Sequence, residues 1–180
     1  MKEDGAINEA KCIQQVKQGS ERAFEHLVRR YTPMVFGLLM ELVANPEDAK
    51  DLTQEAFIKA YRNMKWFRET ARFSTWLYRI AYNTGIDFQR SKKAKRHVPL
   101  EAVNEAAFSL EPSVYSGRSE VIEKGLDALS PSQRVAVVMH YNQGLKLKEV
   151  AEILECAEAT ARVHLFRGLK RLREVLPQDL

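Results

Sequence analysis

The sequence FSTWLYRIAYNTGIDFQRSKKAKR, which spans Phe73–Arg96, predicts one long helix around which the rest of the chain is arranged. Mostly apolar residues fall on one side of it at the helical repeat, as a buried stripe requires: Phe73, Leu77, Ile80, Ala81, Thr84 and Phe88. The opposite side is aromatic as well as polar, with Thr75, Tyr78, Arg79, Tyr82 and Gln89, and with Trp76 and Asn83 along one edge.

The end of this helix is strongly basic and holds Arg90, Lys92, Lys93, Lys95 and Arg96. Lysine and arginine bind phosphates, and flat rings stack on unpaired bases. Exposed aromatic residues that lead into a basic run therefore favour a strand of nucleic acid. An ordinary amphipathic helix with a solvated basic end fits this stretch equally well, so the choice depends on the rest of the chain.

The charge of the chain is modest in total but uneven along its length. The 180 residues, 45% of them hydrophobic, suffice for one large or two small domains. Lysine and arginine number 28 against 24 acids, a net charge of +4. Residues 87–96 hold five basic residues and one acid, residues 160–173 hold five and none, and residues 97–119 hold three glutamates and one arginine. Two basic patches joined by a weakly acidic segment predict two contacts with one polyanion.

Several classes of function find no support in the sequence. Cys12 and Cys156 are far apart and lack the spacing of a metal site or a disulfide framework, so we expect no metal, no cofactor and reduced thiols in a cytoplasmic protein. The sequence has no recognisable signal peptide and no apolar run long enough to span a bilayer. It also lacks a nucleophile–base set and a glycine-rich phosphate loop, so we expect no enzymatic activity.

Cap residues predict where the first helices begin and end. Residues 7–16 indicate a short helix closed by Gly19, and Ser20 is suited to cap the next helix. Pro33 indicates a new start before the apolar stretch 34–43. The buried side of the helix after Ser20 is predicted to hold Ala23, Phe24, Leu27, Val28 and Tyr31.

The whole pattern is all-α, because no segment alternates between apolar and polar residues as a strand does. We expect two small helical domains, at residues 7–96 and 119–176. Residues 97–118 contain proline, glycine and serine with little periodicity, which predicts a flexible linker between the domains.

The helix predicted at Pro46–Asn63, which Asn45 caps, has an acidic ridge beside its buried face. The carboxylates lie within about a sixth of the circumference of one another. Like charges at this spacing repel weakly and do not stabilise the helix, so the ridge predicts a docking edge for a basic partner. A solvated face whose acids interact with the helix dipole is the alternative. The ridge consists of Asp48, Asp51 and Glu55, flanked by Gln54 and Ile58.

Residues 65–72 break the helical pattern and predict a loop with two adjacent aromatic residues, Trp66 and Phe67. A base taken out of a duplex needs a pocket with stacking groups and polar edges. The loop and the helix behind it can supply both, although Trp66 or Phe67 can instead fill the core. The candidate residues of this pocket are Lys65, Trp66, Phe67, Arg68, Arg72, Trp76, Tyr78, Arg79, Tyr82 and Asn83.

The C-terminal part predicts a helix-turn-helix. Ser130 and Pro131 open a helix that ends near Gly144, and residues 147–154 form a short helix. A turn at residues 155–157 then precedes a longer basic helix at Glu158–Val175, which is the layout of a DNA-reading motif.

The last helix has a buried stripe of Ala161, Leu165, Leu169 and Leu172 and an exposed side suited to duplex DNA. Residues in its N-terminal half are positioned to read bases, and later ones to hold phosphates. A solvated basic face is the alternative. The candidate readers are Thr160, Arg162, Val163, Phe166 and Arg167, and the candidate phosphate contacts are Lys170, Arg171 and Arg173.

Four segments carry a family resemblance: PEDAKDLTQEAF (46–57), FSTWLYRIAYN (73–83), LSP (129–131) and EVAEIL (149–154). In this order and spacing they resemble bacterial sigma factors of the extracytoplasmic-function (ECF) group, over residues 10–173. The FSTWLYRIA segment, with Asn83 two positions on, is highly specific, whereas the helix-turn-helix alone is a weak signal.

The resemblance implies a role for each part. Residues 48–61 would dock on the clamp helices of the largest subunit of core RNA polymerase, through Asp48, Asp51, Gln54 and Glu55. The pocket of residues 65–83 would melt the promoter −10 element and capture a flipped base, and residues 119–176 would read the −35 element in the major groove. The linker would run toward the active-site and RNA-exit channels. An anti-sigma factor is the implied regulator, with no direct membrane insertion.

The chain departs from the family pattern at the turn of the helix-turn-helix. Glu155 stands where family members usually have Gly, so it must adopt a conformation that Gly adopts more cheaply, or the turn differs. Val163 and His164 replace the usual Ser and Arg, so the −35 sequence cannot be transferred from the family. Gly168 is expected to loosen the helix locally.

We favour a promoter-specificity subunit that binds core polymerase and recognises two spaced promoter elements. A stand-alone helix-turn-helix regulator with an N-terminal sensor or dimerisation bundle is the alternative. Such a regulator needs neither the loop aromatics nor the acidic ridge, and it would give no transcription unaided.

Overall fold

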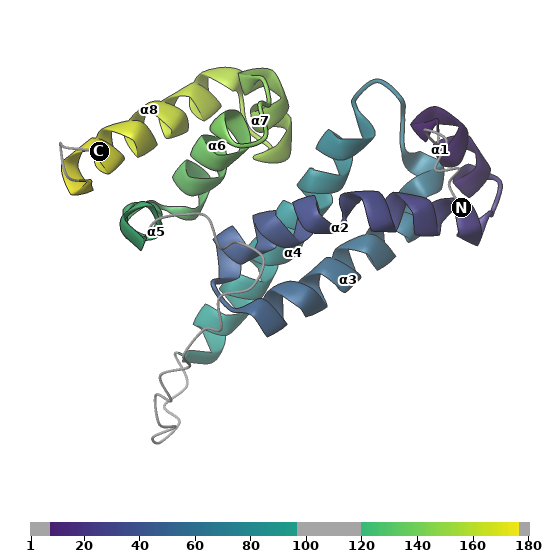
Figure 1. The fold of residues 1–180 in the computed structure, drawn as a ribbon, viewed down its shortest axis with the longest axis horizontal. Helices are drawn as coiled ribbons and strands as arrows, with labels where there is room; N and C mark the ends of the chain where they lie inside the picture. The colour runs from purple at the N-terminus through teal and green to yellow at the C-terminus, as the bar shows by residue number, and fades with distance from the viewer. Residues whose placement is uncertain (1–7, 97–119, 177–180) are drawn as a thin grey trace, which may run out of the picture. The chain divides into compact units, whose positions relative to one another are not determined.

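The computed structural model describes residues 8–96 and 120–176, and both stretches are helical (Figure 1). The first contains α1 (Glu9–Lys17), α2 (Glu21–Val43), α3 (Pro46–Asn63), a 3-10 turn η1 (Met64–Trp66) and α4 (Phe73–Arg96). The second contains α5 (Glu120–Asp127), α6 (Pro131–Tyr141), α7 (Leu147–Ile153) and α8 (Glu158–Val175).

The all-α prediction is confirmed, since neither described stretch contains a strand. The chain divides into two compact units, the first built mainly from α1 to α4 and the second mainly from α5 to α8. The predicted linker, residues 97–118, lies outside the described residues.

The helix starts that cap residues predicted are confirmed. The Ser20 hydroxyl accepts a hydrogen bond from the Ala23 N–H at 3.3 Å, and the Asn45 side chain accepts one from the Asp48 N–H at 3.0 Å. Ser130 forms a capping box with Gln133, in which each side chain accepts from the backbone N–H of the other residue. These bonds satisfy backbone donors that the first turn of a helix leaves unpaired.

The prediction of a new helix start at Pro33 is wrong, because α2 continues through it from Glu21 to Val43. Proline lacks the N–H that would bond to the Arg29 carbonyl. Pro33 and Arg29 are both exposed, so water can satisfy that carbonyl. The buried side of α2 meanwhile continues past the proline without interruption, through Tyr31, Val35, Leu38, Leu39 and Leu42.

The core of the first unit lies between α2, α3 and α4. Helix α3 packs along α2 and buries Ala49, Leu52, Thr53, Ala56, Phe57 and Ala60. Helix α4 approaches α2 closely at Gly85, where a Cβ atom would lie 2.7 Å from Leu42 Cδ1. Lys59 links α3 to α4, because its ammonium group donates to the Thr84 hydroxyl at 3.2 Å.

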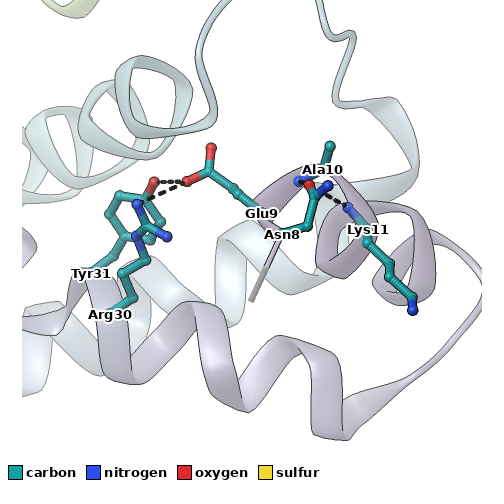
Figure 2. Close-up of polar contacts among 6 residues, drawn as sticks. All are labelled: Asn8, Glu9, Ala10, Lys11, Arg30 and Tyr31. Atoms are coloured by element: carbon teal, nitrogen blue, oxygen red, sulfur yellow. Dashed lines mark hydrogen bonds and ion pairs between the residues drawn. The ribbon is translucent and has the colours of Figure 1, made fainter. Parts of the chain in front are cut away.

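A polar cluster fastens α1 to α2, as Figure 2 shows. The Tyr31 hydroxyl donates a hydrogen bond to the Glu9 carboxylate, which also lies 3.9 Å from Arg30 Nη2. The Tyr31 ring is buried and packs edge-on against Phe73, with ring centroids 5.3 Å apart. Burial raises the pKa of Tyr31 far above its usual value, and the bond to Glu9 adds to the shift.

In the second unit, α8 packs against α6 at Gly168. A Cβ atom there would lie 2.9 Å from Val137 Cγ2 and 3.4 Å from the Gln133 carbonyl oxygen. Our expectation that Gly168 loosens the helix therefore missed its main role, because the absent side chain lets two helices approach closely.

Two kinds of feature are absent from the described part of the chain. No helix within residues 8–96 and 120–176 combines the length and apolar character needed to cross a membrane. The same residues contain no group of three or more His, Cys, Asp or Glu side chains placed to hold a metal ion.

Candidate nucleic-acid interface

The two adjacent aromatic residues of the predicted loop have opposite surroundings. Phe67 is 4% exposed and packs against Phe73 and Trp76, with ring centroids 5.6 and 5.0 Å away. Trp66 is 81% exposed. Phe67 thus fills the core, as one of our alternatives had it, and it fixes the backbone from which Trp66 projects.

The loop itself starts later than predicted, because Lys65 and Trp66 belong to η1 and irregular backbone follows only from Phe67. Helix α1 holds the loop in a way that the sequence did not reveal. The Lys17 ammonium pairs with Glu69 at 3.1 Å and lies 5.4 Å from the centre of the Phe67 ring.

A hollow opens where the loop meets the first turns of α4, and loop and helix residues both line it. Trp66, Phe67, Arg68, Thr70, Ala71, Thr75, Trp76 and Arg79 are among the lining residues. Thr75 is 2% exposed, and its hydroxyl has no hydrogen-bond partner within residues 8–96 and 120–176. Flat rings, two guanidinium groups and an unpaired hydroxyl give this hollow both stacking and hydrogen-bonding capacity.

The aromatic side of α4 is more buried than the sequence predicted. Phe73, Leu77, Ala81 and Thr84 are buried as expected, whereas Ile80 and Phe88 are only half-buried. Thr75, Tyr78 and Tyr82, expected on the exposed side, are 2%, 1% and 9% exposed. The prediction of exposed tyrosines is therefore wrong, because α4 is enclosed over more of its circumference than an amphipathic stripe requires. A base can stack on Tyr78 or Tyr82 only after the groups that cover them move.

The remaining candidates around the loop and on α4 are accessible. Lys65, Arg68, Arg72 and Arg79 are exposed, and Trp76 and Asn83 are half-buried. Arg68 and Arg79 line the same hollow as the exposed Trp66, an arrangement that suits a single strand of nucleic acid. The part these residues play in DNA binding stays a prediction.

The acidic ridge lies on the surface of α3, but it is not purely acidic. Asp51, Gln54, Glu55 and Ile58 are exposed, and Asp48 is half-buried. Glu55 pairs with Lys59 at 2.7 Å, one turn further along the helix. The ridge therefore offers two exposed acids, Asp51 and Glu55, and Lys59 partly balances the charge of Glu55.

An apolar groove that the sequence analysis missed lies at the end of the ridge. Phe24 of α2 contacts Tyr61 of α3, with ring centroids 4.9 Å apart, and Ile58 is 51% exposed beside them. Glu21, Phe24, Phe57, Ile58, Tyr61 and Arg62 line the groove. Exposed apolar residues four and seven positions after Gln54 were the available signal, but the contribution of α2 depends on packing.

The turn before α8 takes the first of the two conformations left open for it, the one that glycine adopts more cheaply. Glu155 has φ 51°, in the left-handed region where a side chain is strained. The Cys156 N–H donates to the Ala151 carbonyl at 3.0 Å, which closes the turn. Burial raises the pKa of the Cys156 thiol, so this cysteine is suited to packing rather than to reaction.

Helix α8 exposes the predicted reading face. Ala161 and Leu165 are buried, and Leu169 and Leu172 are half-buried. Arg162 pairs with Glu158 and Arg171 with Glu174, each at 3.2 Å. The exposed face holds all the predicted candidates, Thr160, Arg162, Val163, Phe166, Arg167, Lys170, Arg171 and Arg173.

Comparison with known proteins assigns the family. The Sigma-70 region 2 model matches residues 27–95, and the Sigma-70, region 4 model matches residues 119–172. The ECF RNA polymerase sigma factor SigW of Bacillus subtilis (strain 168) is 34% identical over 178 residues, which cover 92% of this chain and 95% of SigW. The chain belongs to the ECF RNA polymerase sigma factors. It is therefore a transcription initiation factor.

Other relatives of this sigma factor agree with the assignment. The ECF RNA polymerase sigma-E factor of Escherichia coli (strain K12) is 31% identical over 168 residues, 87% of each chain. Two solved structures share the fold. CnrH, in complex with the cytosolic domain of CnrY, has a TM-score of 0.69 at 20% identity and covers 96% of this chain and 99% of that one. RpoE of Bartonella quintana, in complex with the anti-sigma factor NepR, has a TM-score of 0.71 at 24% identity, covering 87% and 98%.

Proposed function

We propose that this ECF sigma factor binds core RNA polymerase through α3, opens the promoter −10 element at the hollow beside Trp66, and reads the −35 element with α8. In this proposal residues 7–96 form the docking and melting domain, residues 97–118 the linker and residues 119–176 the −35 domain. The observation that carries the melting role is the exposed Trp66, held by the buried Phe67 beside a hollow that Arg68 and Arg79 line.

Docking on polymerase uses the acidic ridge and the apolar groove beside it. Asp48, Asp51, Gln54 and Glu55 offer carboxylates and an amide to basic groups, while Ile58 and Tyr61 offer apolar surface. A partner helix with basic residues along one edge and apolar residues beside them would match both the acidic ridge and the apolar groove. The clamp helices of the largest polymerase subunit are the partner that the family resemblance implies.

Strand opening is driven by binding energy. Flipping a base out of a duplex costs a few kcal/mol, and stacking it on an aromatic ring returns about 1–3 kcal/mol. Trp66 and Trp76 provide rings at the hollow, the Thr75 hydroxyl provides a polar contact, and the surrounding lysine and arginine residues hold the displaced strand. Tyr78, Tyr82 and Asn83 contribute once the covered part of α4 becomes accessible.

Duplex recognition uses the exposed face of α8. Thr160, Arg162, Val163, Phe166 and Arg167 meet base edges in the major groove, and Lys170, Arg171 and Arg173 hold phosphates. The positive φ at Glu155 sets the direction in which α8 leaves the turn, so the turn governs how these side chains enter the groove.

An anti-sigma factor controls the protein in this proposal. The solved structures of CnrH and of Bartonella quintana RpoE each hold a second protein, the cytosolic domain of CnrY and the anti-sigma factor NepR respectively. The protein works in the cytoplasm, contributes no catalysis of its own and uses no cofactor or metal. All chemistry belongs to the polymerase that it directs.

Run-off transcription on a promoter library tests the proposal. Core polymerase with the full-length protein should start transcription at promoters that share two spaced elements, and core polymerase alone should not. A Trp66→Ala variant should retain promoter binding at the −35 element but open fewer promoters. A stand-alone regulator would give no transcription with core polymerase, and that result would overturn the proposal.

A further inference from the structure

The reading face of α8 contains two exposed apolar side chains among its charged residues. Phe166 is 68% exposed and Val163 is 44% exposed. They are three positions apart, which places them next to each other on a helix surface. The cationic Arg162 and Arg167 flank the pair, so this patch lies inside the face that the proposed function assigns to duplex DNA.

Packing does not account for the pair. Helix α8 faces α6 through Ala161, Leu165 and Gly168, and these are its buried residues. Val163 and Phe166 lie away from that contact, and leaving a phenylalanine ring in water forgoes the stabilisation that its burial would bring. Single exposed apolar residues are common on proteins. Two adjacent ones within the face proposed to read DNA favour contact with an apolar group on the bases.

In the major groove, thymine presents an apolar group, its 5-methyl, and apolar side chains recognise it. We propose that Val163 and Phe166 read thymine methyl groups in the −35 duplex. This inference rests on the proposed function, since it specifies the chemistry of bases that α8 selects.

The spacing of the two side chains fits neighbouring bases. Three residues of helix advance about 4.5 Å along its axis. Successive base pairs are about 3.4 Å apart. Val163 and Phe166 can therefore meet thymines one or two steps apart, on either strand. Arg167, the next residue, is exposed and is placed to bond a neighbouring guanine.

Deoxyuridine provides the direct test, because it keeps the hydrogen-bonding edge of thymine and lacks the methyl group. Holoenzyme formed from the full-length protein and core polymerase first selects its −35 element from a randomised promoter library. Each thymine of the selected element is then replaced by deoxyuridine, and the affinity of the holoenzyme for each promoter is measured by competition.

We expect one or two thymines at which loss of the methyl group weakens binding about fourfold. Val163→Ser or Phe166→Ala should weaken binding to the thymine promoter and should abolish the difference between thymine and deoxyuridine at its own position. Arg167→Ala should weaken binding but preserve that difference. Tyr141→Ala, which removes another exposed aromatic ring of the same unit, should leave both measurements unchanged.

Two results would overturn the inference while leaving the proposed function intact. One is a selected −35 element without thymine, and the other is an element whose thymines tolerate deoxyuridine at full affinity. Failure of the proposed function has a different signature, since the holoenzyme would then give no promoter-dependent transcript at all. Circular dichroism of each variant shows that it is folded.

Discussion

At the residue scale, Tyr31 makes the stability of the first unit depend on pH. Burial and Glu9 raise the pKa of its hydroxyl well above the unfolded value of about 10. Above about pH 10 the Tyr31 hydroxyl loses its proton in the unfolded chain and keeps it in the folded chain. The free energy of unfolding therefore falls as the pH rises. The contribution of Tyr31 to the stability of the first unit is therefore complete below about pH 10 and declines as the pH rises further.

Tyr31→Phe should reduce the free energy of unfolding by about 1–2 kcal/mol at neutral pH, because the bond to the Glu9 carboxylate is lost. It should also make the decline above pH 10 less steep than in the wild type. Urea unfolding across this pH range measures both effects. Tyr141→Phe, at an exposed tyrosine, serves as the control and should follow the wild-type curve. Parallel curves for wild type and Tyr31→Phe would contradict the assignment.

Glu155 is strained by its positive φ, and removing its side chain should relieve that strain. A non-glycine residue in this conformation costs about 1–2 kcal/mol, while glycine loses about 0.5–1 kcal/mol of chain entropy on folding. Glu155→Gly should therefore stabilise the second unit by about 0.5–1 kcal/mol in thermal unfolding. Glu152→Gly makes the same replacement inside α7 and should instead destabilise it by about 1 kcal/mol. Equal effects of the two changes would show that Glu155 is not strained.

At the element scale, Gly168 determines how closely α8 approaches α6. Alanine favours helices over glycine by about 1 kcal/mol, yet its Cβ would lie 2.9 Å from the methyl group of Val137. Val137 is β-branched and cannot turn away freely. Gly168→Ala should therefore reduce the free energy of unfolding by about 1–2 kcal/mol, as overpacked cores do.

A double-mutant cycle separates this clash from a general effect on the helix. Val137→Ala alone creates a cavity and should destabilise the protein. In the Gly168→Ala background the same change makes room for the new methyl group, so its cost should be smaller. Additive losses in the double variant would show that the two side chains do not meet.

The helix starts were predictable because each depends on a few consecutive residues. Asn45 and Ser130 bond to backbone groups three positions away, so the sequence contains the whole interaction. The left-handed conformation of Glu155 was one of two alternatives, and it was suggested by the glycine that the resembling family has at this position and not by the neighbouring residues. Pro33 was misjudged, because its effect depends on which side of α2 faces solvent. That orientation follows from packing and not from the local sequence.

The sequence predicted which residues make up the candidate site better than it predicted which of them are exposed. The sequence indicated that Trp66 or Phe67 would enter the core, but packing against Phe73 and Trp76 decided which one. The burial of Tyr78 and Tyr82 and the apolar groove at Phe24 arise between distant segments. A helical wheel treats each helix alone and so cannot locate them.

At the scale of the whole molecule, the docking role proposed for the acidic ridge predicts that polymerase binding can be lost without loss of DNA binding. Asp51→Arg together with Glu55→Arg should abolish association with core polymerase, because it reverses the charge of the docking face. The fold and binding of −35 duplex should persist, since both side chains are exposed and lie on α3. Co-purification with core polymerase and duplex binding by the same preparation measure the two outcomes.

The control for this variant makes the same change in net charge at two residues outside the acidic ridge. Glu25→Arg together with Glu69→Arg reverses two exposed acids of the first unit away from the ridge, and polymerase binding should survive although the Lys17–Glu69 pair at the loop is lost. Unchanged co-purification of the Asp51→Arg, Glu55→Arg variant would refute the docking role. Equal losses in both variants would attribute the effect to net charge.

The two tryptophans of the chain occupy contrasting environments. Trp66 is surrounded by water, whereas Trp76 packs against Phe67 and Phe73. Indole fluorescence moves to shorter wavelengths as water leaves the ring, so Trp66 emits at longer wavelengths than Trp76. A group that covers Trp66 alone changes the long-wavelength emission, whereas a base in the hollow, which Trp76 also lines, changes the emission of both rings. The molecule thus carries an intrinsic optical reporter of occupancy at this loop, readable in real time without a dye.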